Sequence, residues 1–163
     1  MHGIKQYSVN LLFNEDGSKI LLQKKDRTLF AGKLNGVGGK IEDGENPAEG
    51  ALREIMEEAS IHRKDISCFS WIGTLTLPEQ CDMSNADKYP ELWFFAGIVK
   101  DEHLARKPEM ETEEIGWYML GSDGRPFTTL ETAGDGNLEY FIRRARKQLF
   151  GGQAAFYEMD DEL

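Results

Sequence analysis

The hydrophobic residues of this chain fall into several short runs with strand-like spacing and two longer runs with helical spacing. Residues 5–13 and 19–23 flank Asn14-Glu15-Asp16-Gly17, a sequence typical of a turn, and therefore predict a β-hairpin. Further strands are expected at residues 67–77, 92–99 and 115–120. The segments at residues 26–44, 78–90 and 101–112 are expected to be loops, and the first of them is rich in glycine.

The clearest helical signal begins at Asn46, a candidate N-cap. Pro47 fits the first helical position, and Glu49 stands where the acidic residue of a capping box belongs. The following residues place apolar side chains on one face: Ala48, Ala51, Leu52, Ile55, Met56 and Ala59. A second helix is expected at residues 138–150. Several strands with two helices predict an α/β fold in which a mixed sheet carries a helix on each face.

The length of 163 residues suits one domain, which we expect at residues 1–150, followed by an acidic C-terminal tail at residues 151–163. No run approaches the roughly 18 apolar residues of a membrane span, and the N-terminus lacks the apolar run of a signal peptide. Cys68 and Cys81 are too few for a four-cysteine zinc site or a disulfide framework, and they fit a reducing compartment. We therefore expect a cytoplasmic protein.

The chain carries 29 acidic and 19 basic residues, for a formal net charge of −10. Such a surface repels a nucleic-acid backbone, and no basic stripe with interleaved aromatic residues is present in the sequence. A small phosphorylated substrate is still compatible with this charge, because metal ions bridge carboxylates to phosphates. We expect a small-molecule nucleotide as the partner, no nucleic-acid polymer, no membrane, and a monomer or homodimer.

Three glutamates, Glu54, Glu57 and Glu58, are spaced i, i+3 and i+4 in the first predicted helix. They share one arc of the helix, where like charges repel, and Arg53 is the basic residue beside them. A solvated acidic face is one explanation. A bound Mg²⁺ or Mn²⁺ is the other, and the preceding glycine segment favours it by bringing free backbone groups close to the helix.

The spacing of these residues resembles the Nudix box, G-x5-E-x7-R-E-U-x-E-E-x-G-U, where U is a bulky aliphatic residue. The matching positions are Gly39, Glu45, Arg53, Glu54, Ile55, Glu57, Glu58 and Ile61. Ser60 stands where the pattern has its last glycine, which we expect to serve a turn after the helix. The sequence is identified as a MutT-like member of the Nudix hydrolase family, which implies a Nudix-type α/β/α sandwich with a mixed β-sheet and a Mg²⁺-dependent enzyme that hydrolyses phosphoanhydride bonds.

The resemblance also implies roles for the residues that match the box. Glu54, Glu57 and Glu58 correspond to metal ligands, together with the carbonyl of Gly39, and one glutamate helps to deprotonate the attacking water. Arg53 and Glu45 correspond to a pair that braces the loop against the helix. In relatives an acid before the strand that contains Trp117 contributes to the metal site. Glu111, Glu113 and Glu114 are the candidates here, with Glu114 preferred, and a solvated lead-in to the strand is the alternative.

Residues 33–40 resemble the segment of MutT-type enzymes that hydrolyse oxidised purine nucleoside triphosphates such as 8-oxo-dGTP to the monophosphate and pyrophosphate. The resemblance implies that Asn35 contacts the base, although an asparagine here can equally hold the loop through its backbone. Gly38 and Lys40 lie in the glycine segment expected to approach the substrate. Asp135 lies where relatives carry base-reading acids, but their Trp-Pro-Asp-Asp run is absent, and a cap or turn role is the alternative.

Aromatic residues provide candidate stacking surfaces for a base. Phe30, Trp93 and Trp117 are the candidates, and core packing is the alternative for each of them. Residues 93–95 alternate as in a strand, so at least one of them is expected in the core.

Other functions fit parts of the same pattern. Pro78 lies near the place where ADP-ribose and nucleoside-diphosphate-sugar pyrophosphatases of this family carry a proline. A non-catalytic Nudix-fold binding module is a second alternative, although such modules usually lose carboxylates of the box. Hydrolysis of an RNA cap is a third, and the acidic surface argues against it.

Overall fold

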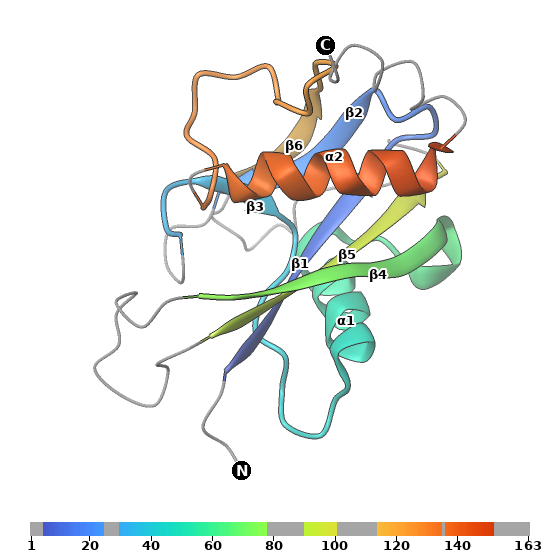
Figure 1. Ribbon diagram of the computed structural model, residues 1–163. Helices are drawn as coiled ribbons and strands as arrows, with labels where there is room; N and C mark the ends of the chain where they lie inside the picture. The colour runs from blue at the N-terminus through green and yellow to red at the C-terminus, as the bar shows by residue number, and fades with distance from the viewer. Residues whose placement is uncertain (1–4, 25–29, 78–89, 101–113, 135, 152–163) are drawn as a thin grey trace.

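The computed structural model describes residues 5–24, 30–77, 90–100, 114–134 and 136–151. Within these residues the chain forms a mixed sheet and two α-helices (Figure 1). The elements, in order, are β1 (Gln6–Phe13), β2 (Lys19–Lys24), β3 (Leu34–Gly36), α1 (Pro47–Ala59), a 3₁₀ turn (Arg63–Asp65), β4 (Ile66–Thr76), β5 (Glu91–Val99), β6 (Glu114–Met119) and α2 (Asn137–Leu149).

The sheet has six strands, five of them in the order β3-β2-β1-β5-β4, with β6 paired to β2. β1 and β5 run parallel, and the other pairs are antiparallel, so the predicted mixed sheet is confirmed. β6 follows one edge of β2, while β1 and β3 share the opposite edge. β2 is therefore paired along both edges, and this holds the backbone of Gln23, a polar residue near its end, in place.

Alternate residues of β1 point to opposite faces of the sheet. Leu11 and Phe13 belong to the core beneath α2, whereas Leu12 belongs to the core beneath α1. Figure 1 shows the two helices on opposite faces. Phe94 stacks on Phe141 of α2 with ring centroids 3.9 Å apart, and burial of such a ring contributes about 1.5–3 kcal/mol. The predicted sandwich is confirmed.

Both faces of the central strands are covered, so residues that alternate between the two faces can all be buried. Phe94 and Phe95 of β5 point to opposite faces, yet both are buried, because a helix or aromatic side chains cover each face. The expectation that at least one aromatic residue among positions 93–95 lies in the core is confirmed.

The start of α1 is confirmed in detail. The Asn46 side chain accepts a hydrogen bond from the Glu49 amide at 2.9 Å, and the Glu49 carboxylate accepts one from the Asn46 amide at 3.0 Å. This reciprocal capping box satisfies two amides that the helix leaves without intrahelical partners. Pro47 occupies the first turn, where its missing N–H has no cost.

Ser60 ends α1 in the left-handed conformation, with φ 60° and ψ 34°, and its amide donates to the Met56 carbonyl at 3.0 Å. This conformation favours glycine, because an L-residue here brings Cβ close to the backbone. The expectation that this position serves the turn after the helix is confirmed, and the serine adopts the turn that the family pattern assigns to glycine.

The expectation that residues 26–44 form only a loop is wrong. Leu34–Gly36 forms β3, which pairs with β2 and places Leu34 in the core. Gly36 permits this close packing, since a Cβ there would lie 2.7 Å from the Asn10 carbonyl oxygen. The strand is defined by contacts distant in sequence, and for that reason local composition did not predict it.

The remaining element boundaries differ from expectation by one residue. Most of the two long expected loops, the acidic tail from residue 152, and Cys81 lie outside the described residues. Cys68 has an exposed free thiol. Among the described residues, no helix is long and apolar enough to cross a membrane.

Candidate active site

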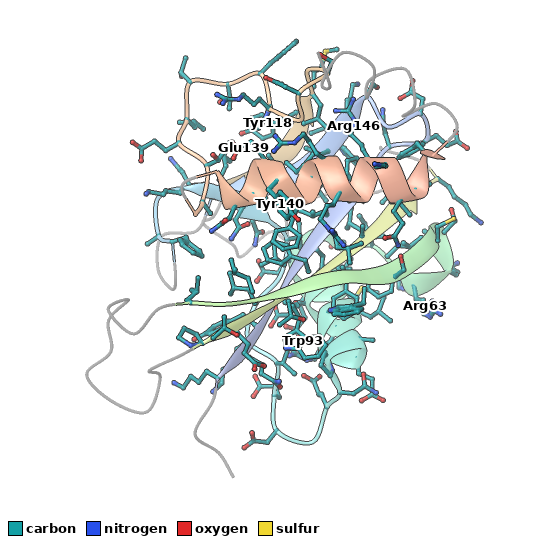
Figure 2. All side chains as sticks on the ribbon, viewed as in Figure 1. Arg63, Trp93, Tyr118, Glu139, Tyr140 and Arg146 are labelled. Atoms are coloured by element: carbon teal, nitrogen blue, oxygen red, sulfur yellow. The ribbon has the colours of Figure 1, made fainter. Side chains whose placement is uncertain are left out.

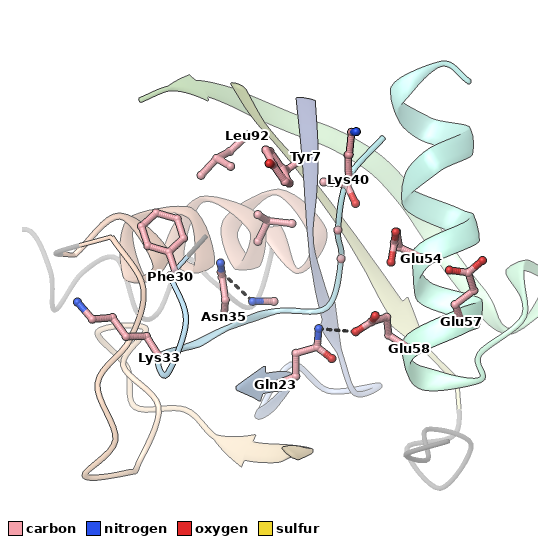
Figure 3. Close-up of a pocket in the computed structure, with 15 residues that line it drawn as sticks. Tyr7, Gln23, Phe30, Lys33, Asn35, Lys40, Glu54, Glu57, Glu58 and Leu92 are labelled. Atoms are coloured by element: carbon pink, nitrogen blue, oxygen red, sulfur yellow. Dashed lines mark hydrogen bonds between the residues drawn. The ribbon is translucent and has the colours of Figure 1, made fainter. Parts of the chain in front are cut away.

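A pocket of about 410 Å³ opens between the glycine segment, the strand ends and α1 (Figure 3). Figure 3 shows Glu54, Glu57 and Glu58 on α1 at one end of it, with Phe30 and Asn35 at the other. The sequence-predicted residues that line it are Phe30, Asn35, Gly38, Gly39, Lys40, Glu54, Glu57 and Glu58. The structure thus brings residues of the carboxylate helix and of the candidate base site to one cavity.

The three glutamates differ in exposure and in partners. Glu54 is buried, at 8% exposed, and accepts a hydrogen bond from Arg53 at 3.1 Å. Glu57 is mostly exposed and accepts from the same guanidinium at 3.2 Å. Glu58 accepts from the side-chain amide of Gln23 at 2.8 Å. Each carboxylate therefore already has a defined orientation toward the pocket.

The pairing of Arg53 with Glu45 is present as predicted. Nε of Arg53 lies 2.6 Å from Oε2 of Glu45, and Nη2 lies 3.0 Å from Oε1. Nη2 also donates to the Lys40 carbonyl at 3.0 Å, so the guanidinium ties α1 to the loop before it. The two parallel bonds form the fork geometry that makes arginine a specific carboxylate partner.

This pair shifts the titration of both groups. The hydrogen bonds from Arg53, and then the one from the Glu42 amide, lower the pKa of Glu45 from 4.5 to about 2. The hydrogen bond to Glu45 raises the pKa of Arg53 above its ordinary value, so its charge is permanent. The brace is therefore an ion pair across the whole neutral range.

The glycines before α1 are required by close approaches. A Cβ on Gly39 would lie 2.7 Å from the carboxyl carbon of Glu54, and one on Gly38 would lie 2.1 Å from the Ser8 carbonyl oxygen. The Gly39 carbonyl accepts a hydrogen bond from the Ser8 amide at 2.8 Å. A carbonyl oxygen has two lone pairs, so one acceptor position is left for a further partner.

The donor set fits a hard divalent cation in chemical type, because carboxylate and carbonyl oxygens are its usual ligands. Within the part of the chain that the structure describes, no three acidic, histidine or cysteine side chains converge as a finished metal cluster. Nη1 of Arg53 binds both Glu54 and Glu57, while Gln23 binds Glu58. The three glutamates thus line one pocket without forming a three-residue metal cluster among the described residues.

At the other end of the pocket, Asn35 bonds to its own loop and forms part of the pocket wall. Its side-chain oxygen accepts a hydrogen bond from the Gly36 amide at 2.9 Å, so it does hold the loop. The same side chain lines the pocket. Phe30 also lines the pocket and packs against the core beneath α2, with a positive φ of 64°.

Other expected site residues are not placed in the pocket. Trp93 belongs to β5 (Figure 2); its ring centroid lies 6.1 Å from that of Trp71 in β4, and its indole N–H donates to Glu91. Trp117 packs against the core beneath α1. Neither is among the described residues that line the pocket. Trp117 packs against the core, as the alternative to base stacking expects, whereas Trp93 is half-buried and belongs to neither core cluster. The side chain of Glu114 and all of Glu111, Glu113 and Asp135 lie outside the described residues.

The pocket is also lined by residues that were not predicted as site residues, namely Tyr7, Ser8, Val9, Gln23, Lys33, Gly36 and Leu92. Most belong to strands and carry no motif. A weak signal was available for Gln23, because a polar residue ends a buried hydrophobic strand, and polar groups in such places need a partner.

Comparison with known proteins now identifies the family. Residues 5–122 match the model of the NUDIX domain, and the chain belongs to the Nudix family. The chain is 29% identical over 152 residues to the oxidized purine nucleoside triphosphate hydrolase of Mus musculus, covering 89% of this chain and 83% of that protein. It is 36% identical over 116 residues to the protein of the same name from Danio rerio, covering 63% and 70%.

The fold agrees with that of a solved protein. The MutT protein from Methanosarcina mazei superimposes with a TM-score of 0.62 at 20% identity, covering 88% of this chain and 96% of that one. The recognition of a MutT-like Nudix hydrolase from its sequence is confirmed. Nudix hydrolases generally use divalent metal ions, and the donor types on the wall of the pocket suit such an ion.

Proposed function

We propose that this protein is a Mg²⁺-dependent pyrophosphohydrolase that converts an oxidised purine nucleoside triphosphate, such as 8-oxo-dGTP, to the nucleoside monophosphate and pyrophosphate. One observation carries the proposal. The carboxylates of the Nudix box line one end of the pocket, and Asn35 and Phe30 line the other end. A nucleotide can therefore place its phosphates beside the carboxylates and its base beside Asn35 and Phe30. The names of the mouse and zebrafish relatives support the same substrate class.

Glu54, Glu57 and Glu58, the Gly39 carbonyl and Glu114 are the proposed ligands of Mg²⁺, with Mn²⁺ as a substitute. When bound, the ion neutralises charge on the phosphate oxygens and lowers the pKa of a water molecule. One of these glutamates accepts the proton of the attacking water. The Glu45–Arg53 pair holds the helix against the loop, and Arg53 also orients Glu54 and Glu57 through its hydrogen bonds.

The remaining pocket residues bind and orient the substrate in this proposal. Lys40 is exposed at the pocket and provides a positive charge for the phosphates. Gly38 lines the pocket, where the polyphosphate can approach its backbone. Asn35 and Phe30 contact the purine, one through its carboxamide and the other through its ring. Asp135 is proposed as a further contact to the base.

The net charge of −10 supports a small nucleotide rather than a nucleic-acid polymer as the partner. A cytoplasmic location, a monomeric or homodimeric state without a membrane partner, and a single Nudix domain at residues 1–150 stay predictions of the sequence. α2 packs on the same sheet as α1, which supports a domain that continues to the end of this helix.

A substrate panel tests the proposal. With Mg²⁺ present, 8-oxo-dGTP, dGTP, ADP-ribose and a capped RNA would be compared at equal concentration, with products separated by chromatography. We expect the highest kcat/KM for the oxidised nucleotide, with pyrophosphate as co-product. Faster turnover of ADP-ribose than of every triphosphate would favour the sugar pyrophosphatase, and binding without turnover of any compound would favour a binding module.

A further inference from the structure

Gln23 links the sheet to the carboxylate helix inside the pocket. It lies near the end of β2, is 3% exposed, and its Nε2 donates to Oε1 of Glu58 at 2.8 Å (Figure 3). The two residues are 35 positions apart in the sequence. Because an ionised carboxylate only accepts hydrogen bonds, this contact fixes which end of the Gln23 amide faces α1.

The backbone that carries Gln23 is held from both sides. In the sheet, Gln23 pairs with Asn35 of β3 on one edge and with Ile115 of β6 on the other. A side chain that starts from a strand fixed in this way has little freedom once it is buried. Gln23 therefore lies between the proposed base contact, Asn35, and the carboxylate Glu58, and it lines the pocket that contains both.

As a donor to Glu58, Gln23 differs in kind from Arg53, which donates to Glu54 and Glu57. Arg53 binds Glu54 and Glu57 with a permanent positive charge, which neutralises part of their charge. The Gln23 amide is neutral, so it orients Glu58 without contributing an opposing ionic charge. Hydrogen bonds of this type to a ligating carboxylate fix its direction and preserve its attraction for a cation.

We propose that Gln23 is a positioning residue that orients Glu58 for divalent metal binding. This inference rests on the proposed function, in which Glu58 is a metal ligand. It assigns to β2 a part in the metal site that the Nudix box does not include.

A matched pair of variants separates this role from simple packing. Gln23→Met keeps the length of the side chain and removes the donor. Gln6→Met makes the same change at a glutamine that donates to Glu91 at 3.0 Å, away from the pocket. We expect Gln23→Met to weaken Mn²⁺ binding to the nucleotide-free protein about 10–100-fold by titration calorimetry. We also expect it to lower kcat by a similar factor with little change in nucleotide KM, whereas Gln6→Met leaves all three values unchanged.

The same measurements in a Glu58→Gln background test whether Gln23 acts through Glu58. Gln23→Met should then cause no further loss of Mn²⁺ affinity, because the interaction is already broken. Thermal unfolding checks that each variant is folded, and Gln23→Asn, which shortens the reach of the amide, replaces Gln23→Met if the latter does not fold.

If folded Gln23→Met has the Mn²⁺ affinity and kcat of the wild type, the inference is overturned, while the proposed function is not affected. An equal loss of affinity from Gln23→Met with or without Glu58→Gln would also overturn it, since Gln23 would then act elsewhere. Unchanged Mn²⁺ binding in Glu58→Gln itself would overturn both the inference and the proposed metal role of Glu58.

Discussion

Arg53 binds Glu45 through two parallel hydrogen bonds, at 2.6 Å and 3.0 Å, and thereby joins the middle of α1 to the loop that precedes it. The same guanidinium reaches Glu54, Glu57 and the Lys40 carbonyl. A single cation thus holds the glycine segment and two of the proposed metal ligands in one arrangement. Its partner Glu45 should control both the stability of this region and the geometry of the site.

Glu45→Gln tests the brace through the pH dependence of stability. The pKa of Glu45 is lowered from 4.5 to about 2 in the folded protein, so its stabilising effect is fully present above the unfolded value. That effect is lost as pH falls from 4.5 toward about 2. We expect Glu45→Gln to lower the free energy of unfolding at neutral pH and to flatten its decline over this acidic range, as measured by urea unfolding at several pH values. Parallel curves for both proteins would contradict the ion-pair account.

Ser60→Gly should stabilise the fold. Ser60 has φ 60°, and the left-handed conformation costs an L-residue about 1–2 kcal/mol. Glycine loses roughly 0.5–1 kcal/mol more conformational entropy on folding, so we expect a net gain of about 0.5–1 kcal/mol in the free energy of unfolding. Ser67→Gly in β4, outside any left-handed position, serves as the control and should destabilise. A lower melting temperature for Ser60→Gly would contradict the assignment of strain to this turn.

Gly39→Ala should impair catalysis more than folding. The added Cβ would lie 2.7 Å from the Glu54 carboxyl carbon, so the carboxylate must move. We expect a loss of about 10–100-fold in kcat/KM, similar to that from disturbing the partners of a metal ligand. Gly116→Ala, where a Cβ meets nothing within 4 Å, is the matched control. Equal activities in the two variants would show that the Gly39–Glu54 approach has no role in the site.

Asn35→Asp separates the two roles of Asn35. The aspartate keeps an acceptor for the Gly36 amide but removes the NH₂ donor. If Asn35 contacts the base, kcat/KM for 8-oxo-dGTP should fall about tenfold or more, because a hydrogen-bond donor to the substrate is lost. The melting temperature should change little. A variant with full activity would leave Asn35 only its structural bond to the loop.

Local sequence signals predicted the parts of the fold that depend on local chemistry. The Asn46–Glu49 capping box involves residues three positions apart, and the start of α1 was therefore predicted to the residue. The spacing of Glu54, Glu57 and Glu58 likewise predicted that they share one side of α1, and all three line the pocket. The boundaries of the strands other than β3 were predicted within one residue, because these strands are hydrophobic runs bounded by polar loops.

Contacts between distant residues were not predictable in the same way. β3 exists because Leu34 fits the core and Gly36 fits beside Asn10, and neither fact is visible in the composition of residues 26–44. The Gln23–Glu58 bond joins residues 35 positions apart. That Asn35 both bonds to its own loop and lines the pocket is likewise evident only in the folded structure.

The central claim is that the box glutamates hold a divalent ion that promotes hydrolysis of a nucleoside triphosphate. The most direct test is the rate of pyrophosphate release from 8-oxo-dGTP, measured against Mg²⁺ concentration for the wild-type protein and for Glu57→Gln. We predict release that requires Mg²⁺ in the wild type and that falls on the order of 10²-fold or more in the variant, with an unchanged melting temperature. Equal release by both proteins, or release that is independent of Mg²⁺, would contradict the account.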